Sequence, residues 1–233
     1  MTAYTKYVYS LWAIFSQTKE IIMKTNTIAV IGGTGKSGHY LVEHLLEKGL
    51  PMKLLLRTPE NFTLKNPLIE VIKGDARDFD AVSCLIKDCS AVISKIGQPI
   101  GEKSIFTDAT NNVIRAMHLY GIKRYTAITG LNVDTPFDHK NDKVKAATEW
   151  MYQNYPKTTK DRQDEYEILV NSDLDWTLVR LPLIIPTSEH CKTEANLTDC
   201  VGEKISAADL SEFLVNQIHD ETYLKASPFL YNI

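Results

Sequence analysis

The stretch IGGTGKSG, residues 31–38, limits the possible folds of this chain more than any other feature. It follows a continuous apolar run that begins at Asn26, and it precedes a segment whose apolar residues share one helical face up to Gly49. A buried strand, a glycine turn and an amphipathic helix in this order begin a βαβ unit. Glycines at positions 32, 35 and 38 permit positive φ angles and let a phosphate approach the start of the helix closely.

The tripeptide at 35–37, Gly-Lys-Ser, also ends the P-loop of nucleotide triphosphatases. A P-loop needs another glycine five residues before Gly35, but that position holds Val30, inside the apolar run. No clear apolar strand elsewhere ends in a magnesium-binding aspartate. We therefore interpret the stretch as a dinucleotide-binding turn.

The rest of the chain alternates strand and helix patterns with short links. Apolar runs predict strands at 52–57, 68–75, 90–97, 123–130 and 175–182, and helices at 79–87, 104–120 and 161–171. A strand end and a helix follow Gly202, where Ser206 and Asp209 have the spacing of a capping box. This alternation predicts an α/β, Rossmann-like, doubly wound parallel sheet with helices on both faces.

We expect residues 23–233 to form a single NAD(P)-binding domain. Two long connections, 131–160 and 184–201, follow the carboxyl ends of strands and are expected to form the walls of a substrate pocket. Residues 1–22 contain an apolar stretch too short to span a bilayer. We interpret them as an extension upstream of a natural start at Met23, with a weak export signal as the alternative.

Composition narrows the partners and the compartment. A net charge of -3 provides no basic field, so nucleic acid is not an expected partner, and neither is a membrane. The four cysteines form no C-x-x-C pair and have no histidine at zinc spacing, so we expect reduced thiols, a cytoplasmic location and no metal site.

The second and third strands indicate which cofactor binds. A carboxylate at the end of the second strand would bind the ribose 2′-hydroxyl of NAD, but Arg57 stands there and suits the 2′-phosphate of NADP. Asp75, at the end of the third strand, is a candidate partner of the adenine amino group. We expect NADP rather than NAD, held by Gly32, Gly33, Thr34, Gly35, Lys36, Ser37, Gly38, Arg57, Asp75, Ala76, Gly97 and Pro182.

Several segments together resemble the atypical short-chain dehydrogenase/reductases of the NmrA-like and NAD(P)H-binding type, with biliverdin-IXβ/flavin reductase-like proteins as neighbours. These segments are IAVIGGTGKSG, LLLR, VIKGDARD, SDLDWTLVRLP and GEKISAADLSEFL, and the resemblance covers about residues 26–233. It implies that the loop after the sixth strand, with Pro182, passes beside the nicotinamide.

One departure from short-chain dehydrogenases concerns the proton donor. None of the 11 tyrosines has a lysine four residues later, so the usual Tyr-x-x-x-Lys pair is absent. Candidate substrate anchors or proton donors are Thr129 at the end of the fifth strand, Asn132 in the loop after it, and Arg162, near the helix position where some relatives carry a lysine.

Two classes of function fit these features. The first is an NADP-dependent oxidoreductase, monomeric or homodimeric, that transfers hydride to a flavin, a quinone or a similar conjugated acceptor, which needs no strong proton donor. The alternative is a non-catalytic NAD(P)-binding regulator or scaffold of the NmrA type. A sugar-nucleotide epimerase fits less well, because that chemistry relies on the Tyr/Lys pair.

Overall fold

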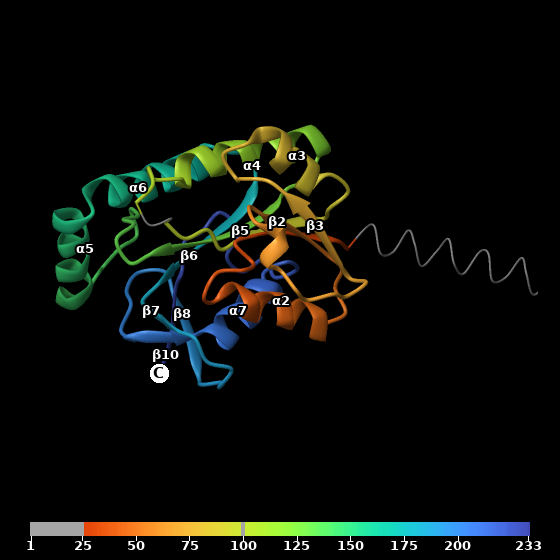
Figure 1. The fold of residues 1–233 in the computed structure, drawn as a ribbon. Coiled ribbons are helices and arrows are strands. Elements are labelled where there is room, and N and C mark those ends of the chain that lie inside the picture. The colour runs from red at the N-terminus through yellow and green to blue at the C-terminus, as the bar shows by residue number, and fades with distance from the viewer. Residues whose placement is uncertain (1–25, 99–100) are drawn as a thin grey trace, which may run out of the picture.

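The computed structural model describes residues 26–98 and 101–233, and an eight-stranded sheet forms its centre (Figure 1). The predictions for residues 1–22 lie outside the described residues. Neighbouring strands pair in parallel except for the last pair, β10 with β8. The order across the sheet is β3 (Ile69–Lys73), β2 (Met52–Leu56), β1 (Ile28–Ile31), β4 (Ala91–Ser94), β5 (Arg124–Gly130), β6 (Asp175–Leu181), β10 (Phe229–Asn232) and β8 (Thr193–Asn196).

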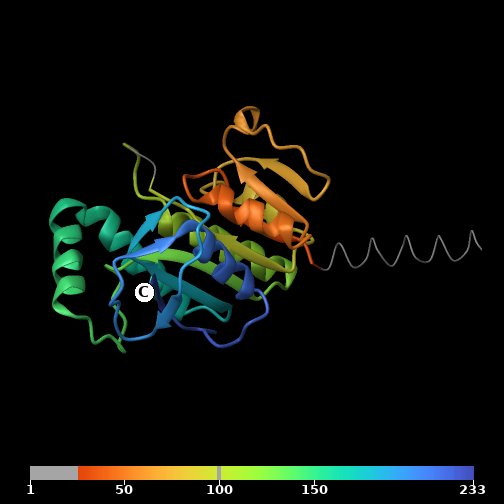
Figure 2. The same ribbon diagram turned by 90° about the horizontal axis from the view of Figure 1, so that it is seen from below.

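Helices cover both faces of the sheet, as Figures 1 and 2 show. One face carries α3 (Phe79–Ile86), α4 (Phe106–Tyr120) and α6 (Pro156–Val170), and the other carries α2 (Gly38–Glu47) and α7 (Ala207–Asn216). The predicted Rossmann-like α/β fold is therefore confirmed. None of the helices in the described ranges combines the length and the apolar character needed to cross a membrane.

The two layers explain the continuous apolar run of the first strand. Ala29 and Ile31 belong to the core under α3, α4 and α6, whereas Ile28 and Val30 belong to the core under α2 and α7. All four residues of β1 are buried, because a central parallel strand has no face left for water.

The long connections contain more regular structure than the sequence predicted. Residues 131–160 include α5 (Asp142–Asn154), and α6 begins at Pro156 rather than at 161. Residues 184–201 include β8 and most of β7 (Leu183–Ile185), which pairs with β9 (Lys204–Ser206) in a second, two-stranded sheet. A short 3-10 helix, Pro59–Asn61, follows β2. The last strand, β10, was also missed, whereas the capping of α7 by Ser206 is confirmed, since the Ser206 hydroxyl accepts from the Asp209 N–H at 2.9 Å.

Candidate functional site

The glycine turn lies at the carboxyl end of β1, where the strand order reverses between β1 and β4. Gly32 has a φ of +82°, and a Cβ there would lie 2.4 Å from the Lys95 carbonyl oxygen. A Cβ on Gly38 would lie 2.2 Å from the Gly32 carbonyl oxygen. A Cβ on Gly35 meets only the Gly32 oxygen, at 3.5 Å. Thus Gly32 and Gly38 are required by the fold of the turn, while Gly35 leaves open space above it.

A cleft of about 390 Å³ opens beside this turn, along the carboxyl ends of β1 to β4. It is lined by seven residues predicted to hold the cofactor, namely Gly32, Thr34, Gly35, Arg57, Asp75, Ala76 and Gly97. The start of α2 has no side-chain cap, because Ser37 accepts no hydrogen bond from the first turn. A helix start beside a cleft suits a pyrophosphate, because the backbone N–H groups of the first turn carry partial positive charge.

Other predicted cofactor residues occupy different places. Gly33 and Gly38 are buried under the turn, and Lys36 and Ser37 lie at the start of α2, outside the lining of the cleft. Pro182 lines a second cavity, described below.

Lys95, which the sequence reasoning missed, lies at the end of β4 and lines the same cleft. It is only 6% exposed, and its Nζ donates to the Ser37 carbonyl at 2.7 Å. No carboxylate of the described residues forms an ion pair with it, and burial lowers its pKa to about 7. The strand therefore brings a buried, uncompensated cation to the start of α2.

At the other end of the cleft, four charged groups form one network. The Arg77 guanidinium donates to both carboxylate oxygens of Asp75 at 3.0 Å, and to Glu102 at 2.5 Å. Arg57 donates to the other oxygen of Glu102 at 2.9 Å. Hydrogen bonds from Arg77 lower the pKa of Asp75, and those from Arg77 and Arg57 lower the pKa of Glu102. Arg57 and Asp75, both predicted, thus lie together, and Arg77 and Glu102 join them.

A second cavity of about 510 Å³ lies at the carboxyl ends of β5 and β6. Both long connections contribute to its walls, and most of the lining is apolar. The lining residues include Leu131, Asn132, Val144, Trp150, Met151, Leu181, Pro182, Leu183 and Val201. Trp150, Leu183 and Val201 are each more than half exposed, so much of the rim of the cavity is apolar as well, beside the exposed Lys143–Glu203 ion pair.

Two of the predicted substrate anchors lie near this cavity. Asn132 lines it, and the Asn132 Nδ2 is buried without a hydrogen-bond acceptor among the described residues. The Thr129 hydroxyl is also buried without a partner there, one residue before Gly130, which lines the cavity. Thr129 itself lines neither this cavity nor the cleft.

Arg162, the third predicted anchor, points into the protein instead. Its guanidinium donates to the Ile128 carbonyl at 2.8 Å, the Ile96 carbonyl at 3.0 Å and the Glu165 carboxylate at 3.0 Å. It also stacks on the Phe106 ring, 3.3 Å from the centroid. In this structure Arg162 is thus a buried brace between the ends of β4 and β5, with both terminal nitrogens of its guanidinium hydrogen-bonded inside the protein.

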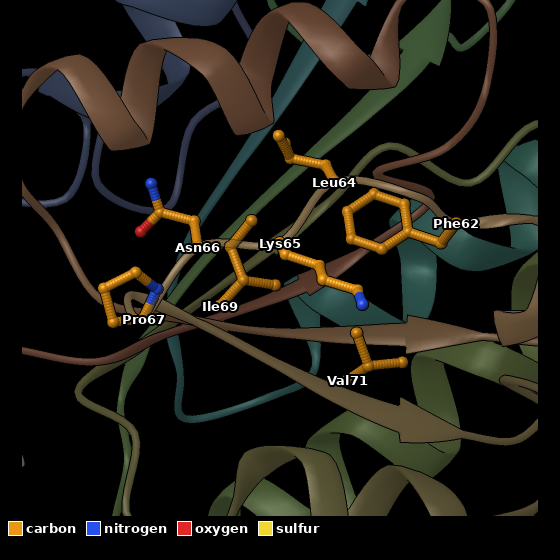
Figure 3. A pocket seen from close by; sticks show the side chains of 7 residues that line it. All are labelled: Phe62, Leu64, Lys65, Asn66, Pro67, Ile69 and Val71. Atoms are coloured by element: carbon orange, nitrogen blue, oxygen red, sulfur yellow. The ribbon is translucent and has the colours of Figure 1, made fainter.

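A third hollow, of about 480 Å³, lies beside β3 and the loop before it (Figure 3). Lys65 is the one titratable residue among its seven lining residues, and the carboxyl ends of the central strands contribute nothing to it. It gathers no groups suited to a reaction, so we do not assign the functional site to it.

Comparison with known proteins agrees with this geometry. A family model described as NAD(P)H-binding matches residues 32–221. An isoflavone reductase homologue from Nicotiana tabacum is 36% identical in an alignment 118 residues long that covers 45% of this chain and 35% of the relative. Subunit 9 of the mitochondrial NADH dehydrogenase (ubiquinone) 1 alpha subcomplex from Arabidopsis thaliana is 28% identical in an alignment 132 residues long that covers 52% of this chain and 33% of that protein. The matched region thus spans about a third of these relatives.

Solved structures show the same fold at low sequence identity. A short-chain dehydrogenase/reductase from Veillonella parvula in complex with NADP has a TM-score of 0.74 at 16% identity, covering 89% of this chain and 94% of its own. ChuY, an anaerobillin reductase from Escherichia coli, has a TM-score of 0.71 at 19% identity, covering 88% and 97%.

Proposed function

This chain belongs to the NAD(P)H-binding family, as its resemblance predicted, and we propose that it is an NADP-dependent reductase that transfers hydride to a flavin, a quinone or a similar conjugated acceptor. We place it in the cytoplasm, in keeping with four cysteines that form no disulfide. The NADP preference, the acceptor class and the location are our proposals.

One observation carries the proposal: a polar cleft and an apolar cavity lie at the carboxyl ends of neighbouring strands. The cleft at β1 to β4 contains the glycine turn and Arg57, which suit a phosphorylated dinucleotide. The cavity at β5 and β6 presents Trp150, Met151 and Pro182, which suit a flat apolar acceptor. A nicotinamide at the junction of the two would face such an acceptor.

For this reaction the protein mainly has to position the cofactor and the acceptor. The bound cofactor supplies the hydride, one proton comes from water, and the acceptor gains two electrons. The chain has no Tyr-x-x-x-Lys pair, and a conjugated acceptor needs none, because its reduced form carries the negative charge over many atoms. Asn132 has an unused amide donor that can hydrogen-bond a carbonyl oxygen of the acceptor.

The first prediction concerns Arg57→Ala. A guanidinium–phosphate contact contributes about 1.5–3 kcal/mol, or roughly 10- to 150-fold in affinity. Arg57 must first leave Glu102, so we expect an effect at the lower end of this affinity range. Wild type should prefer NADPH, and Arg57→Ala should bind NADPH about tenfold more weakly and NADH equally well. Fluorescence titration of both dinucleotides measures this. A wild type that prefers NADH, or a variant that keeps the NADPH preference, contradicts the assignment.

A screen of NADPH oxidation against flavins, quinones and tetrapyrroles tests the activity itself. The missing Tyr/Lys pair and the similarity to a respiratory-complex subunit also favour a second candidate, a non-catalytic NAD(P)-binding regulator or scaffold. The two differ in one result. Tight NADPH binding with no acceptor reduced in the screen supports the regulator, whereas reduction of any one acceptor supports the enzyme.

A further inference from the structure

Two arginines from neighbouring strands hold one carboxylate at the end of the cleft. Arg57 follows β2, Arg77 follows β3, and each donates to a different oxygen of Glu102, at 2.9 and 2.5 Å. A phosphate group presents the same kind of acceptor to a pair of guanidinium forks. Arg57 and Arg77 together therefore form a site that a phosphate could occupy in place of the Glu102 carboxylate.

We propose that Glu102 is the residue that sets the choice between NADP and NAD, because its carboxylate competes with the 2′-phosphate for Arg57 and Arg77. With NADP bound, the 2′-phosphate replaces the carboxylate between the two arginines. With NAD bound, Glu102 stays in place and accepts a hydrogen bond from the 2′-hydroxyl. This inference rests on the proposed function, since it assumes that the cleft binds a nicotinamide dinucleotide.

Charge makes the two arrangements mutually exclusive. With Glu102 present, the group of Arg57, Arg77, Asp75 and Glu102 has no net charge, and without it the charge is +1. In the first case a dianionic phosphate would meet a group without net charge and would lie beside the like-charged Glu102 carboxylate, whereas in the second it would meet an excess of positive charge. The lowered pKa of Glu102 keeps its carboxylate ionised near neutral pH.

The Arg77 side chain is also held by more hydrogen bonds within the chain than the Glu102 side chain would be without its two arginines. Arg77 is held by three hydrogen bonds to Asp75, one from its own backbone N–H. Glu102 lies in an irregular segment before α4, and its side chain is 36% exposed. Its backbone carbonyl accepts a hydrogen bond from the Gln98 Nε2 at 3.0 Å. The Glu102 side chain can therefore turn into water while Arg77 stays in position.

The test is calorimetric titration of Glu102→Gln with NADPH, NADH, adenosine 2′,5′-bisphosphate and 5′-AMP. We expect NADPH and the bisphosphate to bind about tenfold more tightly, the size of one charge-assisted contact, and NADH to bind a few-fold more weakly. Glu70→Gln is the matched control, because it changes the net charge equally through an exposed carboxylate on β3 paired with Lys53. It should change none of the four affinities.

A second variant separates competition from a structural role. In an Arg57→Ala, Arg77→Gln background, Glu102→Gln should no longer raise the affinity for the bisphosphate, because the competed arginines are gone. A Glu102→Gln variant that binds NADPH no better, or that gains equally for the bisphosphate and 5′-AMP, overturns the proposal. Wild type that binds no dinucleotide overturns the proposed function as well, whereas dinucleotide binding without turnover leaves the role of Glu102 standing.

Discussion

Lys95 is a charged residue whose surroundings favour its neutral form. Burial lowers its pKa from 10.5 to about 7, and its Nζ donates a hydrogen bond to the Ser37 carbonyl. Between these two pKa values the unfolded chain binds more protons than the folded one, so this group makes the protein more stable as pH rises from 7 towards 10. Below pH 7 the buried amine is mostly protonated, and its charge destabilises the fold.

We therefore expect Lys95→Met to stabilise the protein in acid. Methionine has a similar shape and no charge, so the free energy of unfolding at pH 6 should rise by about 1–3 kcal/mol. At pH 9.5 the gain should be smaller, because much of the wild-type penalty has gone by then. Urea unfolding at the two pH values measures the difference. Equal destabilisation at both would show that the hydrogen bond to Ser37 outweighs the charge.

The turn and the helix that follows it form the element on which cofactor binding depends. The three glycines of its repeat serve different purposes: Gly32 lets the turn lie against the Lys95 carbonyl of β4's end, Gly38 lets the start of α2 pack on the turn, and Gly35 borders the cleft. A side chain at Gly35 therefore obstructs a ligand, whereas one at Gly38 obstructs the fold.

This difference predicts opposite outcomes for two substitutions. Gly35→Val should keep the circular dichroism spectrum and unfolding midpoint, and lose about 10- to 150-fold in NADPH affinity by blocking one charge-assisted backbone contact. Gly38→Ala should lower the free energy of unfolding by roughly 1–3 kcal/mol, because its Cβ overlaps the Gly32 carbonyl. Tight NADPH binding by Gly35→Val would move the cofactor away from this turn.

On the scale of the whole molecule, Arg180 connects the segments around the second cavity. It is fully buried in β6, and its guanidinium donates to the Ser227 carbonyl at 2.9 Å, the Leu197 carbonyl at 3.0 Å and the Asp138 carboxylate at 2.6 Å. The two long connections and the segment that leads into β10 are thus tied to one side chain. The arginine of the VRLP motif is therefore a structural residue here.

Arg180→Met should be strongly destabilising, because it leaves the largely buried Asp138 carboxylate without its main partner. Removing one member of a buried ion pair lowers the free energy of unfolding by about 3–5 kcal/mol. Urea unfolding of the variant measures this loss. Lys123→Met provides the contrast, since its pair with Asp173 is about half exposed, and such pairs contribute about 0–1 kcal/mol. Equal losses in the two variants would mean that Arg180 does not join these segments.

The sequence by itself determined the central strands, the turn and the class of fold. These features are local: a strand covered on both faces is apolar throughout, and a tight turn needs glycine at set positions.

Tertiary structure alone decided the rest. The α5 helix buries only Val144 among its 13 residues, so no apolar periodicity marked it. Arg57 and Glu102 are 45 residues apart, and Lys95 and Ser37 are 58 apart. Their partners are set by which strand ends meet at one edge of the sheet. Arg162, expected at the substrate, turned inward, where the carbonyls of Ile96 and Ile128 and the Glu165 carboxylate accept hydrogen bonds from its guanidinium.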